Sequence, residues 1–531
     1  MRLAGAAGVW DQKGGVVEDV FIVGGGPSGL FCACELARHG VRARVVDHEP
    51  EPHHQARATA IQPATLELLA RAGVVNEFLR LAVHVHQSRV CGPGLLPLAR
   101  SSFAGIDCAY EFQCCLPQWL TEEILLAHLE QLGGSVERGT TVSSVEQGDD
   151  HLLLSLERAD SGRETVGARY LIGAGGARSI TRSSMREGLE GETYAGRYVV
   201  ADARLASPVA PGEGTVVVSP KGFVLFAPLP GDRWIIFVDI DEAHAGIADP
   251  PTSDAVAALV SERLGTDVGM HDVCWTSHFR MHRRMAPSLA DGRRFLIGDA
   301  GHLSSPLAGE GLNAALMDAA DLAWKLALVL RGRGRPLLLE SYAIERSMAD
   351  QHAITVSDLV HGNVMKLFKA SADGVAPTPA PPDAERDRAL QRSRAMLDVS
   401  YAGSPLIGER LGEGIHRPDG PAPGERYPDR TALAGPRHHL LLFAAAPARL
   451  ARFRSRWDGL VDVIDARTAG LDAARAGVPA GGAVLIRPDG FIGFRAIPAD
   501  SAGLDALDAH LATYLIEVGA PQGQTSGTED Q

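Results

Sequence analysis

The glycine-rich segment Gly24-x-Gly26-x-x-Gly29 constrains the fold of this chain more than any other feature. It follows the apolar run 20–23 and opens the helical pattern 27–39, which predicts a strand, a tight turn and a helix. Gly24 permits the turn, Gly26 lets the backbone approach a pyrophosphate, and Gly29 lets the helix pack closely on the strand. The sequence therefore predicts a Rossmann-like α/β unit whose helix N-terminus faces a phosphate.

A carboxylate completes this fingerprint. Asp47 ends the second apolar run, 44–46, eighteen residues after Gly29. A strand-end carboxylate at this distance accepts hydrogen bonds from the hydroxyls of an adenosine ribose. The pattern predicts a bound dinucleotide but does not distinguish NAD from FAD.

A second glycine-rich segment, 295–313, decides between these dinucleotides. Asp299 ends an apolar strand, and Gly309 and Gly311 form a loop that feeds the helical pattern 314–329. A strand-end carboxylate can bind a ribityl chain, and the free N–H groups after Gly311 can meet a ring carbonyl. FAD offers both groups, whereas NAD lacks the ribityl, so the sequence predicts FAD.

These segments resemble those of the class A FAD-dependent aromatic hydroxylases typified by para-hydroxybenzoate hydroxylase, and more closely the hydroxylases of bacterial aromatic polyketide pathways. The resemblance also rests on the segments 56–67, 117–122, 168–179, 318–326 and 341–346. It implies an α/β fold in which a Rossmann-like FAD-binding domain carries an inserted antiparallel-sheet substrate domain, the para-hydroxybenzoate hydroxylase fold. A thioredoxin-like C-terminal domain follows.

The resemblance implies specific cofactor contacts. It assigns Arg57 and Gln118 to the FAD phosphates and ribityl, and a guanidinium suits a buried pyrophosphate. It places Pro306 beside the reactive ring carbon, and Pro306 and Arg284 are the catalytic candidates. No metal site is predicted. The full cofactor-binding set is Gly24, Gly26, Pro27, Ser28, Gly29, Asp47, Arg57, Gln118, Val142, Asp299, Pro306, Gly309, Gly311, Leu312 and Asn313.

Two departures from the family pattern affect this prediction. The chain has Gly175 where the family usually has an Asp implicated in flavin and nicotinamide binding, and Asp321 where Asn is common. Losing one charge-assisted hydrogen bond costs about 1.5–3 kcal/mol. FAD binding should therefore persist, while reduction of the flavin by a nicotinamide is less secure. His302 follows Asp299 closely, but a structural hydrogen bond is the favoured interpretation of this histidine.

Charge and cysteine usage limit the partners of the protein. The 531 residues contain 51 Lys+Arg and 65 Asp+Glu, a net charge of −14, and no basic cluster, which disfavours nucleic acid and anionic membranes. No apolar run approaches the ~20 residues of a membrane span. Seven cysteines without disulfide or zinc spacing favour a reducing cytoplasm. We expect a monomer or a homodimer.

Composition shifts divide the chain into predicted domains. Alternating runs at 215–219, 222–228 and 233–239 predict the antiparallel sheet. Its aromatic residues Phe223, Phe226, Trp234 and Phe237 are candidates for lining the substrate site, each with an even chance because strand side chains alternate between two faces. The boundaries are a disordered extension at 1–17, the FAD-binding domain at 18–80, 100–185 and 285–370, the substrate-binding domain at 81–99 and 186–284, a linker at 371–395, and the thioredoxin-like domain at 396–525.

The resemblance also implies a reaction. NADPH or NADH would reduce FAD, O2 would form a flavin C4a-hydroperoxide, and the oxygen would hydroxylate a phenolic polycyclic aromatic of the polyketide type. Two alternatives remain open. A Baeyer–Villiger member of the group would insert oxygen into a polyketide ketone, and a protein that lacks the carboxylate at Gly175 could use FAD without redox chemistry for a rearrangement or cyclisation.

Overall fold

The computed structural model describes residues 9–10, 16–55, 58–158, 162–207, 209–373, 384–428, 431, 433, 435–445, 448–479 and 481–517. They fall into two compact units. The first unit comprises Met1–Arg38, Arg42–Ala320 and Arg346–Val399, and the second comprises His39–Val41, Asp321–Glu345 and Ser400–Gln531. Among the described residues, no helix is both long and apolar enough to cross a membrane.

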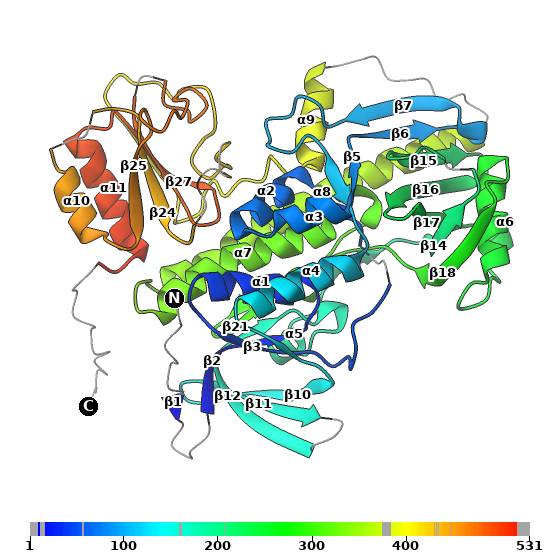
Figure 1. Ribbon diagram of the computed structural model, residues 1–531, viewed down its shortest axis with the longest axis horizontal. Helices are drawn as coiled ribbons and strands as arrows, with labels where there is room; N and C mark the ends of the chain where they lie inside the picture. Colours follow the sequence, from blue (N-terminus) through cyan, green and yellow to red (C-terminus); the bar gives the residue numbers. More distant parts are fainter. Residues whose placement is uncertain are drawn as a thin grey trace. The chain divides into compact units, whose positions relative to one another are not determined.

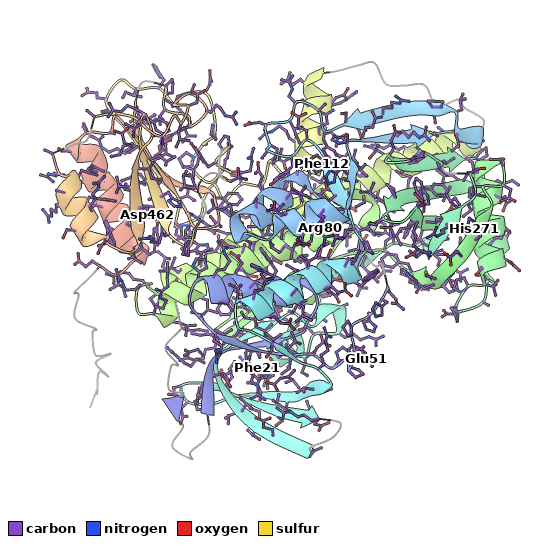
Figure 2. All side chains as sticks on the ribbon, viewed as in Figure 1. Phe21, Glu51, Arg80, Phe112, His271 and Asp462 are labelled. Atoms are coloured by element: carbon purple, nitrogen blue, oxygen red, sulfur yellow. The ribbon has the colours of Figure 1, made fainter. Side chains whose placement is uncertain are left out.

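The main sheet of the first unit has a parallel part in the order β21-β12-β2-β3-β9. Its strands are β2 (Val16–Val23), β3 (Ala43–Val46), β9 (Val136–Glu137), β12 (Gly162–Gly173) and β21 (Arg294–Leu296). Val20, Phe21 and Ile22 of β2 are fully buried, as expected for a parallel strand covered on both faces, and Figure 2 labels Phe21 on this strand. The helices α1 (Pro27–Arg38) and α4 (Gln118–Gln131) pack together, and α1 covers β2 and β3. This is the predicted Rossmann-like unit.

Antiparallel strands extend this sheet (Figure 1). They are β10 (Thr140–Gln147) and β11 (Leu152–Arg158) beside β12, β20 (Ala290–Asp291) beside β21, and β1 (Val9–Trp10) beside β2. The pairing of β1 contradicts a disordered extension over all of 1–17, because its two residues continue the ladder of β2; residues 1–8 and 11–15 lie outside the described part. The helix α5 (Ile180–Ser184) packs against β10, β12 and β21.

The predicted substrate sheet is present in the order β18-β14-β17-β16-β15-β6-β7. Its strands are β6 (Gln87–Cys91), β7 (Pro97–Ser102), β14 (Arg197–Leu205), β15 (Gly214–Ser219), β16 (Gly222–Leu229), β17 (Arg233–Ile240) and β18 (Met270–Phe279). Neighbours are antiparallel except β15 and β6, which are parallel. The helix α6 (Ser253–Leu264) covers one face through Val256, Leu259 and Val260.

Short elements connect the two sheets of the first unit. One small sheet has the order β4-β8-β5 and another the order β13-β19-β22. The remaining elements are β4 (Ala60–Ile61), α2 (Pro63–Ala72), α3 (Val75–Leu81), β5 (Val83–Val85), η1 (Pro93–Leu95), β8 (Gln113–Cys115), η2 (Gly176–Arg178), β13 (Glu190–Thr193), η3 (Glu242–His244), β19 (His282–Met285), η4 (Gly298–Ala300), β22 (His302–Leu303) and η5 (Pro306–Ala308).

Long helices follow the second glycine-rich loop. The chain passes between the two units within α7 (Gly311–Leu330) and again within α8 (Leu337–Ala372). The helix α9 (Ala384–Arg394) then occupies the second half of 371–395, so the prediction of a linker is wrong there. Acidic residues in its first turn and arginines in its last turn complement the helix dipole, which favours a helix despite the polar composition. Residues 374–383 lie outside the described part.

The second unit contains the predicted thioredoxin-like sheet, in the order β23-β27-β26-β24-β25 (Figure 1). β24 and β25 are parallel and flank α10, and β26 and β27 form an antiparallel pair followed by α11. The bounds are β23 (Gly408–Leu411), β24 (His438–Leu442), α10 (Leu450–Arg456), β25 (Val461–Asp465), β26 (Ala483–Ile486), β27 (Ile492–Ile497) and α11 (Ser501–Tyr514). Asp321–Glu345, which the sequence assigned to the FAD-binding domain, groups with this unit because Trp324 and Leu338 join its core.

Candidate functional site

The carboxyl ends of the parallel strands bring the two glycine-rich segments together. β2, β12 and β21 run in the same direction, so Gly24, Gly175 and Gly298 follow their strands at one edge of the sheet. Gly298 lies against the first turn of α1, where an added Cβ would be 3.2 Å from Ser28 Oγ. The two signatures therefore meet in space, as the sequence predicts.

Asp47 is fixed beside the first turn. Its Oδ2 accepts a hydrogen bond from Gly25 N at 2.5 Å, and its Oδ1 accepts one from Glu49 N at 2.8 Å. Gly24 N in turn donates to Val46 O at 2.8 Å. Each carboxylate oxygen keeps a further acceptor position. The side chain is therefore oriented by the backbone and can accept hydrogen bonds from ribose hydroxyls.

The three glycines of the first segment are needed for different structural reasons. An added Cβ would lie 2.3 Å from Ala174 O at Gly24 and 2.0 Å from Gly24 O at Gly29, so the packing of the chain excludes any side chain at both positions. At Gly26 no described atom lies within 4 Å of such a Cβ, and its φ is not left-handed. The open space at the N-terminus of α1 fits the close approach of a pyrophosphate.

The second glycine-rich loop is held by Asn313. Its Oδ1 accepts a hydrogen bond from Gln62 N at 2.8 Å, and its Nδ2 donates to Ala60 O at 2.9 Å and to Gly309 O at 2.7 Å. The side-chain amide of Asn313 is fully buried and already hydrogen-bonded to the protein. A flavin contact at Asn313 would therefore be made by its backbone N–H. The neighbouring Gly311 begins α7, so free N–H groups are available there.

The other predicted cofactor residues occupy varied environments. Gln118 begins α4, and its Nε2 donates to Glu122 Oε1 at 2.9 Å. Asp299 is exposed in η4, and Pro306 is exposed at the start of η5. The side chain of Val142 is buried in an apolar cluster, so a cofactor contact at this residue stays a prediction for its backbone groups. Arg57 lies outside the described residues.

Strand alternation separates the predicted substrate-lining aromatics. Phe226 and Trp234 belong to the cluster that packs on α6, which contradicts a substrate-lining role for both. Phe223 and Phe237 lie on the opposite face, in a cluster that includes Leu307 of η5. The alternation arises because successive strand side chains point to opposite faces. Only Phe223 and Phe237 remain candidates.

Arg284 lies on β19 opposite Leu303 of β22. Its Nη2 donates to Thr193 Oγ1 at 3.0 Å, and its Nε is buried without a hydrogen-bond partner among the described residues. Thr193 Oγ1 also contacts His282 Nδ1 at 2.9 Å. The guanidinium therefore retains a free donor close to the segment that leads to Pro306.

His302 belongs to a buried ion-pair network. Its Nε2 lies 2.8 Å from Asp318 Oδ2, which also accepts from Gly298 N at 2.8 Å. Arg346 donates to Asp318 at 2.7 Å and to Asp350 at 2.6 Å. Burial lowers the pKa of His302, but the charges of Asp350 and Asp318 outweigh it and raise this pKa to about 9. An imidazole that is protonated near pH 7 supports the Gly298 turn through Asp318 and is poorly suited to act as a base.

Glu310 is a buried acid of the second glycine-rich loop that the sequence analysis did not single out. It stands between Gly309 and Gly311 and is 1% exposed. Its Oε2 lies 3.3 Å from Ser357 Oγ, while Oε1 is buried without a hydrogen-bond partner among the described residues. Burial raises the pKa of Glu310 to about 8, so the carboxyl is largely neutral at pH 7. The position of this acid between two loop glycines was the sequence feature that could have drawn attention to it.

The backbone does not require a glycine at position 175, where the family usually has Asp. This residue is exposed, with φ −80° and ψ 19°, and an added Cβ would lie 3.6 Å from Val23 O. That distance is an ordinary van der Waals contact. An aspartate would therefore fit at this position, and the chain lacks only its carboxylate.

The departure at Asp321 belongs to a buried ionic cluster of the second unit. Asp321 accepts from Lys325 at 2.7 Å and from Arg487 at 3.0 Å, and Glu345 accepts from the same two cations at 2.6 and 2.7 Å. With Asp489, which also pairs with Arg487, the carboxylates of this cluster outnumber its cations by one among the described residues. Burial raises the pKa of Asp321 well above its ordinary value. A protonated Asp321 restores neutrality and resembles the usual Asn.

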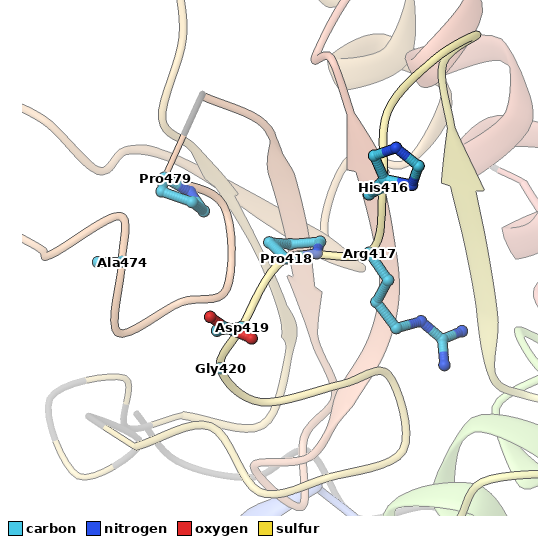
Figure 3. A pocket seen from close by; sticks show the side chains of 7 residues that line it. All are labelled: His416, Arg417, Pro418, Asp419, Gly420, Ala474 and Pro479. Carbon is cyan, nitrogen blue, oxygen red and sulfur yellow. The ribbon is translucent and has the colours of Figure 1, made fainter.

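A hollow of about 600 Å³ in the second unit is separate from this chemistry (Figure 3). Its polar lining is mostly exposed, and the Arg417 guanidinium is already paired with Glu409 at 2.6 Å. None of the predicted site residues contributes to it. The lining residues are His416, Arg417, Pro418, Asp419, Gly420, Ala474 and Pro479. The candidate site is therefore the strand edge of the first unit.

Comparison with known families agrees with this geometry. Residues 18–357 match the family described as FAD binding domain, and residues 409–517 match the family described as aromatic-ring hydroxylase, C-terminal. The first match includes both glycine-rich segments. The second covers most of the described thioredoxin-like sheet.

Similar proteins extend over nearly the whole chain. A 6-methylpretetramide 4-monooxygenase from Streptomyces rimosus is 34% identical and covers 96% of this chain and 95% of its own length. A 12-dehydrotetracycline 5-monooxygenase/anhydrotetracycline 6-monooxygenase from Streptomyces rimosus subsp. rimosus is 31% identical, and the match covers 94% of this chain and 98% of the relative. The solved structure of aklavinone-11 hydroxylase with FAD and aklavinone has a TM-score of 0.76 at 26% identity, and the match covers 93% of this chain and 98% of that chain.

Proposed function

We propose that this chain, which belongs to the family of FAD-dependent aromatic-ring hydroxylases, is a monooxygenase that hydroxylates a phenolic polycyclic aromatic of the polyketide type with NAD(P)H and O2. The relatives named for tetracycline intermediates and the structure bound to aklavinone support this substrate class. The single observation that carries the proposal is the meeting of the two glycine-rich segments where Gly298 lies against Ser28, two residues after the open position Gly26.

The residues at the strand edge have distinct proposed roles. The turn at Gly24–Gly29 and the N-terminus of α1 hold the pyrophosphate, and Asp47 accepts hydrogen bonds from the ribose. The remaining contacts to the FAD phosphates are assigned to Pro27, Ser28, Arg57 and Gln118. Asp299 accepts hydrogen bonds from the ribityl, and backbone groups at Val142, Gly309, Gly311, Leu312 and Asn313 complete the cofactor set. When bound, FAD supplies the transfer of electrons to oxygen, and the protein supplies orientation.

The apolar face of the substrate sheet has the character that a flat aromatic ring requires. Phe223 and Phe237 are 1% and 5% exposed, and Tyr198 stacks on Phe237 with ring centroids 5.0 Å apart. Leu307 joins this cluster directly after Pro306. Such a face excludes water from the reacting atoms. Arg284 offers a charged donor at its margin for an oxygen of the substrate or for the nicotinamide.

The lack of a carboxylate at Gly175 favours one alternative, a flavoprotein that rearranges or cyclises its substrate without redox chemistry. A second alternative is Baeyer–Villiger insertion into a ketone. Hydroxylation and insertion both add one oxygen, so only the structure of the product separates them. The redox step separates both from the rearrangement.

The test uses the full-length FAD-loaded protein. NADPH and NADH are added anaerobically, with and without anhydrotetracycline, 6-methylpretetramide or aklavinone, and the visible absorbance of the flavin is followed. The proposal expects bleaching that a substrate accelerates, and a product one oxygen heavier once air is admitted. A flavin that stays oxidised under all these conditions would refute the redox proposal.

We also place the enzyme in the cytoplasm and expect a monomer or a homodimer. The described cysteines are all free, and burial raises the pKa of Cys114 to about 12, so it remains an unreactive thiol. Sedimentation of the FAD-loaded protein decides the oligomeric state.

A further inference from the structure

We propose that Tyr194 and His361 form a recognition pair that hydrogen-bonds a phenol or enol hydroxyl of the aromatic substrate. The inference rests on the proposed function, because it names how the substrate of that function is held. Neither residue belongs to a nucleotide-binding segment. Tyr194 directly follows β13, and His361 lies on α8 within the first unit.

The two rings form a stacked pair with free polar atoms. Their centroids are 4.4 Å apart and their planes differ by 22°. Among the described residues, no group hydrogen-bonds Tyr194 Oη or His361 Nδ1, although both atoms are buried. Folded proteins rarely keep buried polar atoms without partners, so each such atom needs a water, an ion or a functional role to explain it. Two such atoms on one stacked pair point to a ligand with matching polar groups.

Backbone contacts place Tyr194 next to the expected flavin edge. Tyr194 N donates to Met281 O at 3.1 Å, and Met281 Sδ accepts from Ser305 Oγ at 3.3 Å. Ser305 caps η5, whose first residue is Pro306. Tyr194 is thus tied through one residue to the segment that the family places beside the reactive ring.

Contacts of α8 place His361 at the same segment. Ser357 Oγ donates to Ser305 O at 3.3 Å, and His361 lies one helical turn further along α8. Val364, three residues after His361 and so on the same side of α8, packs in the same cluster as Phe223 and Leu307. The pair therefore borders the apolar face that is proposed to receive the aromatic ring.

The pair offers one donor and one acceptor. Burial lowers the pKa of His361, so its imidazole is neutral near pH 7 and one ring nitrogen accepts a hydrogen bond. Tyr194 Oη donates. A phenol or enol hydroxyl both donates and accepts, so it satisfies both atoms, whereas a methyl ether can only accept.

Access requires side-chain movement. Both polar atoms are shielded from solvent, so a substrate reaches them only when neighbours in the cluster shift. Met281 and Met365 contribute to the cluster and its margin. Methionine is unbranched and repacks readily, so this movement needs no change of the backbone.

The test measures binding to the full-length FAD-loaded protein by isothermal titration calorimetry. The probes are the tricyclic phenol alizarin and alizarin dimethyl ether. The wild type is expected to prefer the phenol by about tenfold, the usual effect of one or two net hydrogen bonds. Tyr194→Phe and His361→Phe each lose most of this preference, because affinity for the phenol falls while affinity for the ether stays. His361→Asn keeps an acceptor near Nδ1 and retains more of it.

Two readouts separate recognition from a structural role. Tyr110→Phe, a matched change at a tyrosine outside this cluster, keeps the wild-type preference. The thermal midpoint of Tyr194→Phe and His361→Phe stays level or rises, because each change removes a buried unpaired polar atom. Phenylalanine variants with the wild-type preference, or a wild type without any preference, overturn the inference. If the wild type still bleaches with NADPH and hydroxylates a substrate, the proposed function survives that failure.

Discussion

Replacing Gly26 with alanine separates cofactor binding from folding. No described atom lies within 4 Å of the added Cβ, and the backbone at Gly26 is not left-handed. The methyl group therefore meets no protein atom. A glycine replaced by alanine at a compatible position gains about 0.4–1 kcal/mol of stability, because the unfolded chain loses freedom. The protein without FAD should be as stable as the wild type or slightly more stable.

The same methyl group should impair FAD binding. It occupies the space through which a pyrophosphate reaches the N-terminus of α1 and so lengthens at least one N–H···phosphate contact. A hydrogen bond to a charged group contributes about 1.5–3 kcal/mol, which corresponds to a roughly tenfold to hundredfold weaker Kd. Thermal unfolding without FAD and titration of flavin fluorescence measure the two effects separately.

Gly29→Ala is the matched control. Its Cβ would lie 2.0 Å from Gly24 O, so this variant must distort the turn and lower stability even without FAD. The reasoning fails if Gly26→Ala binds FAD as tightly as the wild type. It also fails if Gly26→Ala unfolds at the lower temperature expected of Gly29→Ala.

Four further substitutions test the buried carboxylates and the position of Gly175. Glu310→Gln should gain stability over the wild type as pH rises from 4.5 to about 8, because the native carboxyl stays protonated while the unfolded one ionises. Above pH 8 the difference in unfolding free energy between the variant and the wild type reaches a plateau of no more than about 5 kcal/mol, because each unit of pKa shift corresponds to roughly 1.4 kcal/mol. A difference in urea midpoints that does not change with pH contradicts this prediction. Gly175→Asp should leave the thermal midpoint unchanged, since its Cβ fits, and should speed flavin bleaching by NADPH about tenfold or more; an unchanged rate in stopped flow refutes a missing-carboxylate effect. Asp321→Asn should change stability by less than about 1 kcal/mol, whereas Glu345→Gln, which weakens a buried pair with Lys325 and Arg487, should cost about 3–5 kcal/mol. Equal losses in calorimetry contradict the charge balance.

The nucleotide unit was predictable because its sequence pattern is local. Strand, turn and helix follow one another around Gly24, and Asp47 ends the next strand. The meeting of Gly298 with Ser28 was also predictable, because parallel strands share a carboxyl edge. The thioredoxin-like domain was expected from the family resemblance.

Other features depend on packing that a single sequence does not encode locally. Alternation shows that Phe226 and Phe237 can face opposite sides, but only the position of α6 shows which side is core. In the sequence Glu310 resembles an exposed loop acid, but in the structure it is buried and contacts Ser357 on α8. Asp321–Glu345 joins the second unit through Trp324, a long-range contact.

The remaining differences lie in short segments. Val142 lies on β10, where its side chain fills an apolar cluster, so the predicted cofactor contact stays open for its backbone groups. The charged pattern at Ala384–Arg394 suits an exposed helix as well as a linker, and its charges at the two ends decide for the helix.

Labelled oxygen tests the central claim most directly. The FAD-loaded protein is supplied with NADPH, a polycyclic phenol such as anhydrotetracycline, and heavy-isotope oxygen gas, and the product is analysed by mass spectrometry. The account predicts that each product molecule carries one labelled oxygen atom on an aromatic carbon. A product that forms equally well without oxygen, or that contains no label, would contradict it.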